Sequence, residues 1–170
     1  SRKVVNEFPI EILSLKFRGS VYDTEDLSKA DISNKLKKLY FWDYYYNKAL
    51  VLNQRVSSGD YLTDQNFSAT DQTPKDVALL DNSSRSILNG DLLKYICQSK
   101  LEADVDDVTW NSGARKSFYI SGPDSTVKND MDYLINGYSD VDGYPAYFDY
   151  CRKCQSFRLE SYRDLFLRYE

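Results

Sequence analysis

Two long segments in which apolar residues recur at helical spacing constrain the fold most. In the first, residues 31–54, steps of about 100° per residue place one apolar stripe on a helix. The stripe comprises Ile32, Leu36, Leu39, Trp42, Tyr46, Ala49 and Leu50. Phe41, Tyr45 and Leu52 fall on the opposite side, so this helix would be apolar nearly all round. Such a helix is usually central and packed on more than one side; the alternative is that its second face is a docking surface.

The second segment, residues 144–169, predicts a C-terminal helix. Its apolar stripe comprises Tyr144, Tyr147, Phe148, Cys151, Cys154, Leu159, Tyr162, Leu165, Phe166 and Tyr169. Off the stripe lie Arg152, Lys153, Arg163 and Arg168, together with Phe157 and Leu167. Arg158 falls within the stripe, so its guanidinium should either reach water or pair with an acid from elsewhere in the fold.

Between and before these segments the signals are shorter. β-branched and aromatic residues predict a strand near 9–18 that ends at Arg18-Gly19, with further strands near 107–111 and 116–121. Helix-start and periodicity signals predict helices over 74–81, from Asp91 to before Asp104, and over 128–136, with a turn at 140–143. Residues 57–73 are polar and without period, which is typical of a long loop.

These elements predict an α+β fold. We expect a predominantly helical single domain over residues 1–170, in which the helices 31–54 and 144–169 pack on a small β-sheet. The length suits one domain, whether it stands alone or is a piece excised from a larger protein. No apolar run approaches the roughly 18 residues of a membrane-spanning helix.

The chain contains no histidine. This excludes Ser-His-Asp and Cys-His catalytic arrangements and any zinc site with a histidine ligand. Catalysis through carboxylates, lysine, tyrosine or a bound metal stays open. Because histidine is the commonest general acid–base residue, its absence favours a function other than an enzyme.

Three cysteines, Cys97, Cys151 and Cys154, are an odd number. This argues against a complete disulfide framework and favours a reducing, intracellular compartment. Cys151 and Cys154 have CxxC spacing but lie in the predicted C-terminal helix, and a zinc site would need further ligands. We therefore interpret the pair as free, helical, metal-free residues of the core.

The acidic residues form no specific metal motif. The Asp-x-Asp pairs are Asp104/Asp106, Asp130/Asp132 and Asp140/Asp142. The last pair resembles the middle of a Ca²⁺ loop, but Tyr138 occupies the position of the first ligand. Solvated turn acids are the preferred interpretation, and no cofactor is predicted. The alternative is a carboxylate- or metal-dependent enzyme that uses Mg²⁺ or Ca²⁺.

Aromatic residues point to a binding surface. The chain has 15 Tyr, 8 Phe and 2 Trp, and exposed aromatic residues often anchor interfaces. The net charge of −4 makes nucleic acid an improbable partner. We therefore predict a non-enzymatic protein–protein interaction domain, part of a larger protein or assembly. Its predicted binding residues, on one continuous surface that meets an acidic or aromatic partner, are Phe41, Tyr45, Arg152, Phe157 and Arg163.

Overall fold

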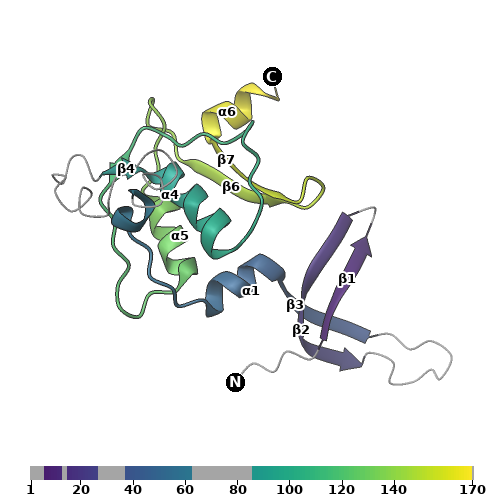
Figure 1. Cartoon of the computed structure of the whole chain (residues 1–170). Helices are drawn as coiled ribbons and strands as arrows, with labels where there is room; N and C mark the ends of the chain where they lie inside the picture. The colour runs from purple at the N-terminus through teal and green to yellow at the C-terminus, as the bar shows by residue number, and fades with distance from the viewer. Residues whose placement is uncertain (1–5, 13–14, 27–36, 63–85, 170) are drawn as a thin grey trace. The chain divides into compact units, whose positions relative to one another are not determined.

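The structure is a computed structural model. It describes residues 6–12, 15–26, 37–62 and 86–169, with side chains from residue 43 onward. The chain divides into two compact units, Ser1–Ala49 and Leu50–Glu170, which are described separately (Figure 1). The predicted helix 74–81 and most of the predicted loop 57–73 lie outside the described residues.

The first unit contains a three-stranded antiparallel sheet in the order β1-β2-β3. Its strands are β1 (Asn6–Ile12), β2 (Leu15–Asp26) and β3 (Lys37–Asp43). The single strand predicted near 9–18 is therefore wrong, because that stretch is divided between β1 and β2. Gly19 does not end a strand, since it pairs with Phe8 on one side and Asp43 on the other. Pairing on both sides outweighs the local preference of glycine for strand ends.

The predicted helix 31–54 is also wrong. Lys37–Asp43 forms β3, and among the described residues of this segment, 37–54, the helix is confined to Tyr44–Val51, as α1. The Asp43 carboxylate begins α1 by accepting hydrogen bonds from the Tyr45 and Tyr46 backbone N–H groups, at 3.1 and 3.3 Å. The uninterrupted apolar run Leu39–Trp42 suits a strand as well as a helix, and its aromatic residues favour strands. Antiparallel pairing with β2 decides between the two.

The second unit combines helices with two short antiparallel pairings, β4 with β5 and β6 with β7, of which the second is a hairpin. Its elements are β4 (Ile87–Leu88), α4 (Asn89–Tyr95), the π-helical turn η1 (Ile96–Lys100), β5 (Lys116–Ser117), α5 (Val127–Asn136), β6 (Ala146–Cys151), β7 (Ser156–Ser161) and α6 (Tyr162–Leu167). Residues 58–62 are also helical. The described residues thus have a mixed α+β fold.

The core of this unit lies where α4 and η1 pack on α5 (Figure 1). Its fully buried side chains include Leu92, Leu93, Ile96, Leu101, Val127, Leu134 and Leu159. The predicted helices from Asp91 and over 128–136 are confirmed as α4 and α5. Thr126 caps α5 by accepting a hydrogen bond from the Asn129 N–H at 3.3 Å. α4 begins at Asn89, two residues before the predicted start, and has no side-chain cap, so its apolar spacing rather than a start signal made it predictable.

The short strands were predicted less well. Residues 107–109 form a turn in which Val108 is 95% exposed, so the strand near 107–111 is wrong. Of the strand near 116–121, only Lys116–Ser117 pairs, with β4, apart from an isolated bridge between Ser57 and Ile120. The turn at 140–143 is present: the Asp140 carboxylate accepts from the Asp142 and Tyr144 N–H groups, and Gly143 has φ +86°.

The predicted C-terminal helix 144–169 is wrong. It is a hairpin, β6 and β7, followed by the short helix α6 (Figure 1). Residues alternate between two faces of this hairpin, which is a period of two rather than 3.6. The register pairs Phe148 with Leu159 and Tyr150 with Phe157 on the inner face. The other face, which we call the outer face, carries Asp149 opposite Arg158 and Tyr147 opposite Glu160.

The hairpin changes the interpretation of the CxxC pair. Cys151 ends β6 and Cys154 lies in the turn that follows, so neither residue is helical as predicted. Both are free thiols; Cys154 is exposed and Cys151 half-buried, whereas Cys97 is buried in the core. The prediction that Cys151 and Cys154 are core residues is therefore wrong, because the turn carries them away from the inner face.

Candidate functional site

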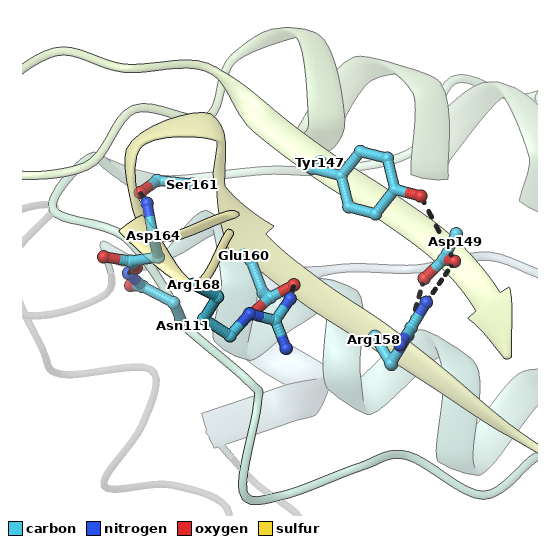
Figure 2. Close-up of polar contacts among 8 residues, drawn as sticks. All are labelled: Asn111, Tyr147, Asp149, Arg158, Glu160, Ser161, Asp164 and Arg168. Carbon is cyan, nitrogen blue, oxygen red and sulfur yellow. Dashed lines mark hydrogen bonds and ion pairs between the residues drawn. The ribbon is translucent and has the colours of Figure 1, made fainter. Parts of the chain in front are cut away.

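The outer face of the β6–β7 hairpin carries a fork-shaped ion pair (Figure 2). The Arg158 guanidinium donates from Nε to Asp149 Oδ1 at 3.0 Å and from a terminal nitrogen to Oδ2 at 2.6 Å. Hydrogen bonding to Asp149 raises the pKa of Arg158. The expectation that Arg158 pairs with an acid is met, although on a strand and across the hairpin. Two parallel hydrogen bonds hold both side chains in one orientation.

Tyr147 extends this group along β6. Its hydroxyl donates to Asp149 Oδ2 at 3.4 Å, and the Asp149 carboxylate raises the pKa of the Tyr147 phenol. The phenol therefore stays protonated near neutral pH and serves as a donor. Asp149 therefore receives hydrogen bonds from two directions, from Arg158 and from Tyr147.

A second polar group fastens α6 to the hairpin (Figure 2). Ser161 caps α6 by accepting from the Asp164 N–H at 3.1 Å, and the Asp164 carboxylate accepts from Asn111 Nδ2 at 2.7 Å. Arg168, just after α6, pairs with Glu160, whose side chain is nearly buried. Burial raises the pKa of Glu160, and the charge of Arg168 opposes that rise. These contacts hold a helix that is too short to be stable alone.

In α6, Tyr162, Phe166 and Leu167 are exposed, Leu165 is half-buried, and no residue of the helix is fully buried. The Tyr147 and Tyr162 rings meet edge to face at 5.8 Å between centroids, and the Tyr162 and Phe166 rings lie 6.1 Å apart. We call Tyr147, Tyr162 and Phe166 the α6 aromatic patch. Phe166 is 63% exposed, and Leu167 and Tyr169 beside it in the chain are exposed too. Polar contacts position the patch, in which Tyr162 and Phe166 are exposed and Tyr147 is half-buried.

Within the second unit, the predicted binding residues Arg152, Phe157 and Arg163 do not form one exposed surface. Phe157 lies in the core at 6% exposure, so its placement on an exposed surface is wrong. Arg152 lies in the β6–β7 turn, at the opposite end of the hairpin from Arg163, which pairs with Asp142 from α6. Tyr45 is half-buried on α1, with its ring edge-on to Tyr44 at 5.0 Å.

The remaining predicted residue, Phe41, belongs to β3, and its side chain lies outside the description. Phe41 and Tyr45 both belong to the first unit, whereas the other three residues belong to the second. Of the predicted five, Arg163 alone lies on α6. The patch itself could have been found from the alternation of residues 146–151 and 156–161 around the polar break at 152–155.

The aspartates of the three Asp-x-Asp pairs are mostly engaged in structural contacts. Asp132 pairs with Lys128, Asp142 with Arg163, and Asp140 closes its own turn. Among the residues with described side chains, no group of three or more Cys, Asp or Glu side chains is placed to hold a metal ion. The described aspartates therefore build turns and ion pairs.

Asp130 has a different environment, because it is fully buried. Its carboxylate accepts hydrogen bonds from Tyr119 at 2.6 Å, Ser121 at 2.9 Å and Ser125 at 2.6 Å. Burial is the main cause that raises the pKa of Tyr119, and the Asp130 carboxylate raises it further. Three hydroxyl donors satisfy the buried charge and tie residues 119–125 to α5. Since Asp130 has no exposed surface, a substrate has no access to it in this conformation.

The comparisons with known proteins supply no relative. No protein-family model, no curated protein and no solved structure matches this chain. Among the described residues, no helix is both long and apolar enough to cross a membrane. The functional argument therefore rests on the site itself.

Proposed function

We propose that this protein is a non-enzymatic protein–protein interaction domain and that the α6 aromatic patch is its contact surface. One observation carries the proposal: the Tyr162 and Phe166 rings lie 6.1 Å apart and exposed on a helix that buries none of its own residues. Exposed aromatic groups held in a fixed orientation can bind with little further loss of side-chain entropy. Tyrosine and phenylalanine are also enriched at protein interfaces.

The surrounding charges indicate the chemistry of the partner. Arg163 is already paired with Asp142, and Arg168 with Glu160. An acidic partner would have to compete with these internal carboxylates for both arginines. The contact left for a partner is therefore mainly apolar, and we propose a protein that presents apolar or aromatic side chains. The arginine pairs at the rim would contribute to orientation and association rate more than to affinity.

The alternative of a carboxylate- or metal-dependent enzyme has less support. Its best candidate acids, Asp149 and Glu160, each have an arginine partner, and Asp130 is enclosed by hydroxyl groups. The contact surface therefore remains the function that the described residues favour.

The test uses a photo-crosslinking residue in place of Phe166 to identify the partner in its native source. Binding of that purified partner is then measured with wild type, the double variant Tyr162→Ala/Phe166→Ala, and Val108→Ala. Val108 is a matched control because it is apolar, exposed and outside the patch. We expect the double variant to weaken binding by at least about tenfold, as for removal of an interface anchor.

Equal affinities of the double variant and wild type would contradict the proposal. Sedimentation of the isolated protein provides a second test. If the isolated protein self-associates and the double variant does not, the partner at this surface is a second copy of this chain and not the proposed partner protein.

A further inference from the structure

The closed end of the β6–β7 hairpin brings two free cysteines together. Cys151 is the last residue of β6, pairs with Ser156, and is followed by the turn 152–155. Gln155 completes this turn in the left-handed region, with φ +53°. Cys154, in the turn, is exposed, and Cys151, at the end of β6, is half-buried.

The two cysteines contact each other directly. The Cys154 backbone N–H donates a hydrogen bond to Cys151 Sγ at 3.1 Å. Hydrogen bonding from the Cys154 side chain, helped by backbone N–H groups and Arg158, lowers the pKa of Cys151, while the same pairing raises the pKa of Cys154. Arg152 and Lys153 stand between them in the chain, and cationic surroundings favour a thiolate. The hydrogen bond that Cys151 Sγ accepts from the Cys154 N–H makes Cys151 the candidate attacking thiol and Cys154 the candidate resolving thiol.

From this geometry we propose that Cys151 and Cys154 form an exchange-active dithiol, which a small-molecule disulfide such as oxidised glutathione converts reversibly to an intramolecular disulfide. The spacing permits the bond. Residues i and i+3 of a β-turn have Cα atoms closer than about 7 Å, and disulfides require about 4.4–6.8 Å. Such a bond closes a very short loop, so it adds little stability to the fold and is readily reduced again.

The reaction proceeds in two exchanges. The Cys151 thiolate attacks one sulfur of the small disulfide, a mixed disulfide forms, and one small thiolate leaves. Cys154 then loses its proton to solvent and attacks the Cys151 sulfur, which forms the Cys151–Cys154 bond and expels the second small thiolate. The dithiol is oxidised by two electrons, and one small disulfide is reduced to two thiols.

Cys97 provides an internal control. It is fully buried, and burial raises the pKa of its thiol. A buried thiol of this kind exchanges slowly, so oxidation of the folded protein should not involve it.

In the experiment, the reduced, folded protein is equilibrated with buffers of increasing oxidised-to-reduced glutathione ratio, and exchange is then quenched with acid. The remaining thiols are alkylated under denaturing conditions, and the peptides are mapped by mass spectrometry. We expect a loss of two hydrogen masses in the peptide that contains Cys151 and Cys154, reversed by excess reduced glutathione, with Cys97 alkylated throughout. Three outcomes would overturn the proposal: two unmodified thiols at every glutathione ratio, oxidation through Cys97, or metal retained by Cys151 and Cys154 in place of a disulfide.

Single variants test the roles of the two sulfurs. In Cys154→Ser, Cys151 keeps its backbone N–H donors, so it should accumulate a mixed disulfide with glutathione and react several-fold faster than Cys154 does in Cys151→Ser. Neither variant touches the inner face of the hairpin, and thermal melting of both should match wild type. A faster reaction of Cys154 in Cys151→Ser would overturn the assignment of the attacking sulfur.

Discussion

Two sets of aromatic rings within residues 144–169 have opposite surroundings. On the inner face of the hairpin, Phe148 and Phe157 stack with centroids 5.2 Å apart, and Tyr150 and Trp110 add further ring contacts. On α6, Tyr162 and Phe166 also lie ring to ring, yet Phe166 is exposed. Contact between rings is therefore no sign of a core. The rings of the inner face are enclosed by other elements and therefore stabilise the fold. The rings on α6 are not enclosed, which leaves them available to a partner.

The largest expected effect is on the structural set. Phe157→Ala should lower the free energy of unfolding by about 3–5 kcal/mol, because it removes a buried ring from a packed cluster. Chemical denaturation monitored by circular dichroism measures the change. A loss below about 1 kcal/mol would mean that Phe157 is not enclosed and that the comparison between the two sets fails.

The ion pair on the outer face should have an intermediate effect. The Arg158 and Asp149 side chains are 26% and 27% exposed, between the surface and buried cases. Arg158→Met should therefore cost about 1–2 kcal/mol of unfolding free energy. In the double variant with Asp149→Asn, the cost should be smaller than the sum of the single costs. Strict additivity would show that the two side chains do not interact in solution.

The buried Glu160 beneath α6 predicts a pH effect. Burial raises its pKa in the folded protein, so between the ordinary and the raised value the folded state holds more protons than the unfolded state. Its contribution to stability is therefore largest below this window and falls as pH rises through it. The difference in unfolding free energy between wild type and Glu160→Gln should show this slope, and a difference that is independent of pH would contradict it.

The smallest expected effect on stability is at the exposed set. Phe166→Ala should change the free energy of unfolding by less than about 0.5 kcal/mol, since the ring packs on few neighbours. The same denaturation experiment as for Phe157→Ala measures it. A loss comparable with that of Phe157→Ala would show that α6 is enclosed in solution, and the α6 aromatic patch would then not be a surface.

The sequence predictions fail mainly in segments whose apolar pattern fits both the helical period of 3.6 residues and the strand period of two. In residues 37–43 and 146–161, aromatic residues are so frequent that a helical stripe can be drawn through strands. The alternation of Asp149 and Arg158 with apolar neighbours carries the correct period of two, but this signal is visible only after the break at 152–155 is recognised as a turn. The candidate site was missed for the same reason: its residues come from two strands and a helix.

The sequence by itself determined α4 through apolar spacing, α5 through apolar spacing and the Thr126 cap, and the turn at 140–143 through its turn chemistry, because these signals act within a few neighbours along the chain. It also predicted that Arg158 would either reach water or pair with an acid. Only the tertiary structure decided that this acid is Asp149, that Phe157 is enclosed while Phe166 is exposed, and that Cys151 and Cys154 meet at the closed end of the hairpin. These outcomes depend on which strand pairs with which, and pairing energy comes from residues that are distant in sequence.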